Sequence, residues 1–287
     1  MWVPFGHKKS SQGWYNREGT HKGCPLVVMN DSKQRDQRWA CFELWGGNRK
    51  VAHPVDLPGL VGWIESTPLE PATGGGDVHY VSVCNRGMTS RIALADVAGH
   101  GNLASAVAER LREVLQRHTN NWDQSVLMRE LNDAFLEGAT GIQYATAVVL
   151  GFYRETGELL FTSAGHLPPF WYRAGEQRWD VLEVGTPHAR EIEGLPLGVI
   201  PGTNYTQTAV ELGLNDLVVL YTDGLTEARD EAGQLLGQEG LLALARQCPV
   251  ESPVSTARGL LDRLATFRGR SLSRDDETLV VLQRVSV

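Results

Sequence analysis

The sequence has little cysteine and no long apolar run. Four cysteines occur in 287 residues and none forms a Cys-x-x-Cys pair, so a zinc ribbon or a thioredoxin-like redox site has no support. No apolar stretch approaches the roughly 20 residues that a membrane-spanning helix needs. Residues 1–9 lack the charged region, apolar stretch and cleavage site of a secretory signal. These absences predict a cytoplasmic protein with free thiols and no membrane contact.

Lysine is absent after residue 50. The first 50 residues hold all five lysines, and their nine basic residues against four acidic ones give a net charge of +5. The rest of the chain holds 18 arginines and 30 acids, or −12, which makes the total −7. Such an acidic body argues against non-specific binding of nucleic acid. We expect residues 1–56, which are basic and rich in tryptophan, to form an N-terminal extension of unclear role. It could be solvated, packed on the body as a strand, or bound to an acidic partner.

Residues 57–287 are expected to form one α+β domain. Short apolar and β-branched segments come in blocks, with amphipathic stretches in pairs between them, which favours two mostly antiparallel sheets flanked by helices over regular βαβ alternation. Helices are predicted at 103–118, 122–137, 235–248 and 254–267, and strands at 78–84, 91–97, 144–152, 159–163, 168–172, 179–182, 217–221 and 278–285.

Four acidic segments stand beside glycines or at the ends of apolar runs. They are Gly75-Gly76-Asp77, Asp96-Val97-Ala98-Gly99-His100-Gly101, Tyr221-Thr222-Asp223-Gly224 and Asp275-Asp276-Glu277-Thr278. Carboxylates brought together stay ionised only when positive charge sits between them. Hard divalent cations such as Mg²⁺ and Mn²⁺ take oxygen ligands of this kind. Taken alone, each segment is also compatible with a solvated turn. No Gly-Lys-Ser/Thr sequence occurs, so the first segment is not a nucleotide-binding phosphate loop.

Together and in this order, the segments resemble the bacterial metal-dependent serine/threonine phosphatases of the PPM superfamily, in particular the sporulation stage II E-type branch. The run from Tyr221 to Ala228 matches the pattern of that branch almost letter for letter. The resemblance extends from Leu57 to Val285 and implies an α-β-β-α sandwich. Relatives often carry a further aspartate at the place of Tyr80, and a serine is more usual at Ala98.

The resemblance also implies a set of metal ligands. Two divalent cations, Mn²⁺ or Mg²⁺, would be held by the carboxylates of Asp77, Asp96, Asp223 and Asp275 and by the carbonyl of Val97. Asp276 follows Asp275 in an extended segment, so its side chain points to the opposite side. It would therefore lie on the rim of the metal site or bind backbone groups. Gly224 would let the backbone turn tightly beside the aspartate that precedes it.

Two histidines are candidates for supporting roles. His100 could protonate a leaving alkoxide, because the pKa of histidine lies near neutrality, and it joins the four aspartates as a catalytic candidate. His166 lies in Ala164-Gly165-His166-Leu167-Pro168-Pro169, a stretch typical of the family, and is expected to stabilise a loop. The alternative is a structural role for His100 and a catalytic role for His166.

The resemblance implies hydrolysis of phosphoserine or phosphothreonine on a protein substrate. A water activated between the cations would attack phosphorus with no covalent enzyme intermediate. Relatives of this branch often act on a phosphorylated regulator of the anti-sigma antagonist type in a partner-switching pathway, and the helices after Asp96 suggest a homodimer. Two alternatives stay open: a non-catalytic binding module on a phosphatase fold, and a metal-dependent hydrolase of small phosphoesters or nucleotides.

Overall fold

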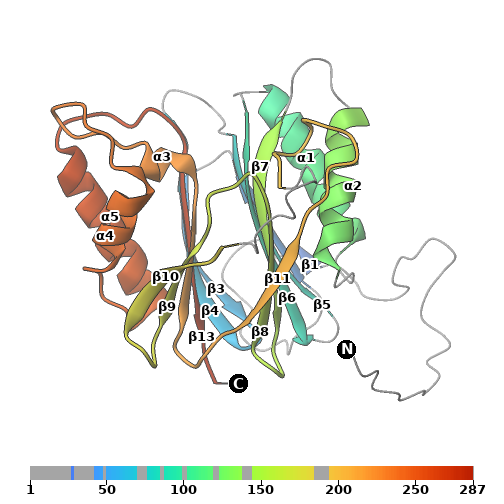
Figure 1. Cartoon of the computed structure of the whole chain (residues 1–287), viewed down its shortest axis with the longest axis horizontal. Helices are drawn as coiled ribbons and strands as arrows, with labels where there is room; N and C mark the ends of the chain where they lie inside the picture. Colours follow the sequence, from blue (N-terminus) through green and yellow to red (C-terminus); the bar gives the residue numbers. More distant parts are fainter. Residues whose placement is uncertain are drawn as a thin grey trace, which may run out of the picture.

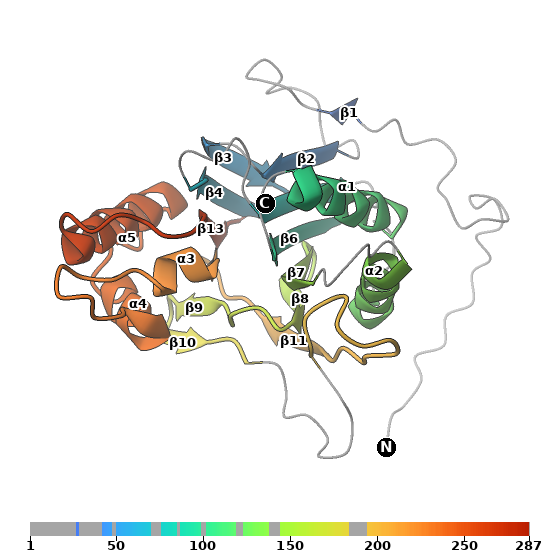
Figure 2. The same ribbon diagram turned by 90° about the horizontal axis from the view of Figure 1, so that it is seen from above.

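Two sheets face each other in the middle of the molecule, and helices cover their outer faces (Figure 1). The structure is a computed structural model of the whole chain. It describes residues 27–28, 42–47, 50–69, 76–84, 87–98, 102–118, 123–137, 144–183 and 194–286. The view from above shows α1 and α2 on one side and α4 and α5 on the other (Figure 2). The four-layer sandwich expected from the sequence is confirmed.

Among the described residues, seven strands form the first sheet in the order β1-β2-β5-β6-β7-β8-β11. Every neighbouring pair is antiparallel except β1 and β2. Two of these pairs, β5–β6 and β7–β8, join strands that are consecutive elements of the chain, and such antiparallel neighbours need only a short connection. The strands are β1 (Val27–Val28), β2 (Phe42–Gly47), β5 (Asp77–Cys84), β6 (Thr89–Val97), β7 (Ala145–Tyr153), β8 (Glu158–Ala164) and β11 (Gln207–Glu211).

The second sheet holds six of the described strands in the order β10-β9-β12-β13-β4-β3, all antiparallel. Its central strand β12 reads Leu-Val-Val-Leu-Tyr, and all five residues are buried because the strand is covered on both faces. The strands are β3 (Val51–Leu57), β4 (Leu60–Thr67), β9 (Phe170–Arg173), β10 (Arg178–Val181), β12 (Leu217–Tyr221) and β13 (Glu277–Arg284).

Four helices lie close to their predicted places. They are α1 (Asn102–Arg117), α2 (Gln124–Glu137), α4 (Gly237–Ala245) and α5 (Pro253–Arg268). The short α3 (Asp223–Thr226) was not predicted. The start of α5 is fixed by a reciprocal pair of hydrogen bonds between Ser252 and Ser255, with Pro253 in the first turn. It ends at Gly269, whose φ of +59° favours glycine.

Three apolar clusters hold the layers together. One lies between the two sheets and includes Ile64, Leu150 and Leu220; a second lies under α1 and α2; a third lies under α4 and α5. Each fully buried aliphatic side chain of this kind contributes about 1.5–3 kcal/mol relative to exposure. Because every layer has an apolar partner, the strand ends that carry the acidic segments are held at fixed positions.

Strand β2 lies before residue 57, and strand β3 ends at that residue, where the sequence suggested that the N-terminal extension gives way to the domain. Strand β2 pairs with β5 and strand β3 with β4, so both are built into the two sheets. The role of the remaining residues before 57 stays a prediction. Within the described part of the chain, no helix has the length and apolar character needed to cross a membrane.

Candidate active site

Asp77 and Asp96 are direct partners in the first sheet. Asp77 is the first residue of β5 and Asp96 is the penultimate residue of β6. The two are paired in the antiparallel ladder. Side chains of directly opposed residues project from the same face of a sheet. The side chain of Asp77 is buried, with 3% of its surface exposed. Two of the predicted ligands are therefore brought together by strand register alone.

Asp223 and Asp275 come from neighbouring strands of the second sheet. Asp223 begins α3, two residues after β12 ends, and Asp275 lies two residues before β13 begins. The ladder between these strands ends with Tyr221 opposite Leu279, and the Thr222 amide donates to the Thr278 carbonyl at 3.1 Å. Both aspartates thus leave the sheet at the end where α3 lies (Figure 1).

Threonines link the acidic ends of the two sheets. The Thr222 hydroxyl donates to Asp77 Oδ2 at 2.7 Å and accepts the amide of Thr278 at 2.9 Å. The Thr278 hydroxyl in turn shares a 2.8 Å hydrogen bond with Ser66 on β4. Sequence reasoning did not assign these threonines, although each one lies inside an acidic segment. Their role depends on contacts between residues more than 50 positions apart.

Asp276 binds backbone, as its position beside Asp275 suggested. Its Oδ1 accepts the amide of Leu69 at 2.7 Å and its Oδ2 accepts that of Gly76 at 2.5 Å. The carboxylate therefore fixes the chain just before Asp77. Asp275 is exposed, and its Oδ1 accepts the amide of Asp276 at 2.8 Å.

Gly224 is needed for a different reason from the one inferred from sequence. It lies within α3, and its φ is not in the left-handed region that favours glycine. A Cβ atom built on it would overlap the carbonyl oxygen of Asp276. The glycine thus allows α3 to pass directly against the segment that enters β13.

The carboxylates of the site raise one another's pKa. Burial and then the neighbouring Asp223 and Asp275 raise the pKa of Asp96 from 3.8 to about 7. Burial and then Asp96 raise the pKa of Asp77 well above its usual range. Burial, followed by the negative charges of Asp275 and Glu227, raises the pKa of Asp223. Glu227, which the sequence did not single out, is therefore part of the same acidic cluster.

The donor chemistry of this cluster fits hard divalent cations. All of its side-chain donors are carboxylate oxygens, which suit Mg²⁺ and Mn²⁺. The carboxylates act on one another electrostatically. Their present arrangement is nonetheless too open to coordinate an ion. Within the described part of the chain, no three His, Cys, Asp or Glu side chains are grouped closely enough to do so. Like charges repel one another, and a cation between them would offset that repulsion.

His166 supports the strand that carries Thr146. Its Nδ1 shares a 2.8 Å hydrogen bond with the hydroxyl of Thr146, the residue opposite Asp96 in the β6–β7 ladder. Burial lowers the pKa of His166 to about 4, so the ring is neutral at pH 7. The carbonyl and amide of His166 both bind the Ser163 hydroxyl, which fixes the turn after β8.

His100 lies outside the described residues. Val97 ends β6, and its amide donates to the Gly76 carbonyl at 3.1 Å.

The raised pKa of Asp96 predicts a pH-dependent penalty in the metal-free protein. Between about pH 4 and 7 the folded state holds a proton that the unfolded chain, with a pKa of 3.8, has released, so this group destabilises the fold as pH rises. Buried His79 and His166 have lowered pKa values and act in the opposite direction. We therefore expect Asp96→Asn to gain stability relative to wild type from pH 5 to pH 7.5.

Urea denaturation in the presence of a chelator would measure this difference. Asp262→Asn, on the exposed face of α5, is the matched control and should show a constant difference from wild type across the same range. A constant difference for Asp96→Asn as well would contradict the electrostatic account of the site.

Two facing antiparallel sheets flanked by helices, with acidic residues gathered at one end, define the fold of the PPM phosphatases. The SiaA-PP2C domain of Pseudomonas aeruginosa shares it with a TM-score of 0.65 at 20% identity, over 78% of this chain and 86% of that one. The family model described as Stage II sporulation protein E (SpoIIE) matches residues 86–285. The chain belongs to that family.

Two relatives are similar in sequence as well. Phosphoserine phosphatase RsbU of Bacillus subtilis (strain 168) is 27% identical over 194 residues, which is 67% of this chain and 55% of RsbU. The solved RsbU and RsbW domains of Rv1364c from Mycobacterium tuberculosis give a TM-score of 0.66 at 26% identity, over 82% of this chain and 62% of that one. The chain thus spans about half the length of RsbU.

Proposed function

We propose that this protein is a metal-dependent serine/threonine phosphatase that removes phosphate from phosphoserine or phosphothreonine on a protein substrate. The observation that carries the proposal is the 2.7 Å hydrogen bond from Thr222 to Asp77. It ties the acidic end of one sheet to that of the other, which supports a site built from carboxylates of four distant segments. The name of RsbU, a phosphoserine phosphatase, supports the same activity.

The carboxylates of Asp77, Asp96, Asp223 and Asp275 would hold two divalent cations, Mn²⁺ or Mg²⁺. Cations bound there supply Lewis acidity that makes hydroxide available near neutral pH and disperses charge on the phosphoryl oxygens. The chain's part is to position these ligands. Thr222 orients Asp77, while Asp276 fixes the backbone at Gly76. Thr222, Asp77 and Asp276 are all buried, so Asp77 would be held in position before a cation binds.

Four further points remain predictions. The carbonyl of Val97 would be an additional metal ligand, and His100 would donate a proton to the leaving alkoxide. A homodimer would form near α1 and α2. The substrate would be a phosphorylated regulator of a bacterial partner-switching pathway, of the anti-sigma antagonist type. The presence of RsbU and RsbW domains together in Rv1364c supports this kind of partner.

The test is release of phosphate from a phosphoserine peptide and from a nucleotide, each measured with and without Mn²⁺. We expect Mn²⁺-dependent turnover of the peptide with a higher kcat/KM than for the nucleotide. Preference for the nucleotide would favour a small-phosphoester hydrolase. The absence of turnover on either substrate, with the protein folded, would favour a non-catalytic binding module.

A further inference from the structure

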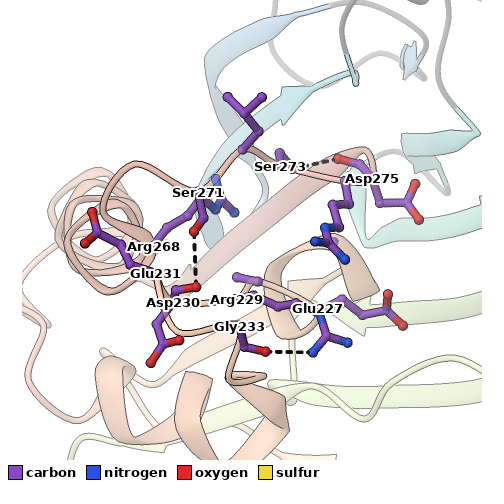
Figure 3. Close-up of a pocket in the computed structure, with 13 residues that line it drawn as sticks. Glu227, Arg229, Asp230, Glu231, Gly233, Arg268, Ser271, Ser273 and Asp275 are labelled. Atoms are coloured by element: carbon purple, nitrogen blue, oxygen red, sulfur yellow. Dashed lines mark hydrogen bonds between the residues drawn. The ribbon is translucent and has the colours of Figure 1, made fainter.

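A cleft opens beside the predicted metal ligands. It has a volume of about 530 Å³ and lies between the loop that leaves α3 and the loop that joins α5 to β13 (Figure 3). Glu227 and Asp275 line it at the end nearest the acidic cluster, and Leu272 and Arg274 also form part of its wall. The cleft therefore runs from the site of the proposed reaction onto the neighbouring surface.

The two loops are fastened to each other, so the cleft has a defined shape. The Ser271 hydroxyl donates to the Asp230 carbonyl at 3.1 Å, and the Arg270 amide donates to Glu231 Oε1 at 3.1 Å. Asp230 also organises its own loop, because its Oδ1 accepts the amides of Ala232 and Gln234 at 2.9 and 2.8 Å. A preformed cleft of this kind loses little conformational entropy when a ligand binds.

Most charged side chains that line the cleft already have hydrogen-bond or ion-pair partners, whereas two arginines keep unused donors. Arg268 pairs with Glu277, while Asp230 and Glu231 accept backbone amides. Arg229 donates Nη1 to the Gly233 carbonyl at 3.0 Å and keeps its other donors (Figure 3). Arg274 is exposed and has no hydrogen bond or ion pair to any residue that the structure describes. Four carboxylates and three arginines line the cleft, and three of the carboxylates, those of Asp230, Glu231 and Asp275, accept backbone amides. Arg229 and Arg274 thus offer unused positive donors beside the proposed reaction site.

An exposed leucine points to a polypeptide as the occupant. Leu272 lines the cleft with 87% of its surface exposed, the largest fraction among the exposed large apolar residues of the described chain. A small phosphoester held at the metal site would leave Leu272 and most of the cleft uncovered. A peptide chain extending from the phosphoserine would contact both the leucine and the arginines.

We propose that this cleft binds the polypeptide flanking the phosphoserine, and that Arg229 and Arg274 select substrates with acidic residues there. The inference rests on the proposed phosphatase function and adds a substrate class to it. Arg274 is the better position to test, because its side chain supports no other described part of the fold, whereas Arg229 holds the Gly233 carbonyl.

Three phosphoserine peptides that differ only in their flanking residues, acidic, alanine or lysine, would test the inference. Wild type should show the highest kcat/KM for the acidic peptide. The charge reversal Arg274→Glu should lower that value about fivefold and raise the value for the lysine peptide about threefold, the range expected for exposed charge pairs. Arg246→Glu is the matched control: it reverses the same charge at an exposed position after α4 that does not line the cleft. This variant should leave the order of the three peptides by kcat/KM unchanged.

A binding measurement tests the peptide selectivity of the cleft independently of phosphate release. In NMR titrations without metal, the unphosphorylated acidic peptide should shift the backbone amides of residues 271–274 more than the alanine peptide does, and Arg274→Glu should remove the difference. Equal shifts would overturn the inference. So would an equal loss of kcat/KM on all three peptides, because Arg274 would then bind the phosphoryl group itself. If wild type released no phosphate from any peptide, the phosphatase proposal would fail, and the titration would still decide whether the cleft selects acidic chains.

Discussion

Asp223→Asn is expected to lower Mn²⁺-dependent phosphate release from a phosphoserine peptide by about a thousandfold or more. A cation that polarises a phosphoryl oxygen supplies several kcal/mol of transition-state stabilisation, and each 1.36 kcal/mol is a factor of ten in rate. Asparagine keeps the shape of the side chain but removes the charge that would hold the cation. Steady-state phosphate release at saturating Mn²⁺ measures the loss.

The same variant should fold at least as well as wild type. Burial and the charges of Asp275 and Glu227 raise the pKa of Asp223, so replacing it relieves repulsion in the metal-free protein. Urea denaturation with a chelator checks this point, and Asp262→Asn serves as the activity control. Undiminished turnover by Asp223→Asn would refute its assignment as a ligand.

Gly224→Ala is expected to destabilise the protein by about 3 kcal/mol, at the upper end of the usual cost of overpacking. The added methyl group would overlap the backbone carbonyl of Asp276, which cannot swing away as a flexible side chain can. Moving that carbonyl would displace Asp275 as well, so activity should fall together with stability. Urea denaturation and phosphate release measure the two effects.

Gly175→Ala is the control for this substitution. Gly175 lies in the β9–β10 turn, and a Cβ atom there meets nothing within 4 Å. The change should stay within about 0.5 kcal/mol of wild type. Equal stability of Gly224→Ala and Gly175→Ala would show that α3 does not pack against the entry to β13 as described.

The sequence was sufficient where local pattern and acidic motifs coincide. The apolar run before Asp223 predicted a buried strand with an aspartate at its end, and β12 ends at Tyr221 as expected. The strands predicted at 78–84 and 91–97 are present as β5 and β6, and their pairing sets Asp77 opposite Asp96. In both cases the placement depends on residues close together in the chain.

Strands β3, β4 and β11 were not predicted from the sequence, and two of the three are polar or interrupted. Strand β3 contains Pro54 and lies at the edge of its sheet, where a missing backbone donor is tolerated. Strand β11 is the edge of the other sheet, and none of its five residues is buried. The link from Thr222 to Asp77 spans 145 positions, so no local pattern could reveal it. The positions of β5, β6 and β12 were predictable from local pattern, whereas contact between the two sheets was not.

The central claim is that carboxylates from four segments hold a pair of cations. Anomalous diffraction from crystals soaked in Mn²⁺ tests it most directly, because it locates the ions without relying on activity. The account predicts two manganese peaks among Asp77, Asp96, Asp223 and Asp275, and loss of at least one peak in Asp223→Asn crystals. Manganese bound elsewhere, or no peak at this end of the sheets, would contradict it.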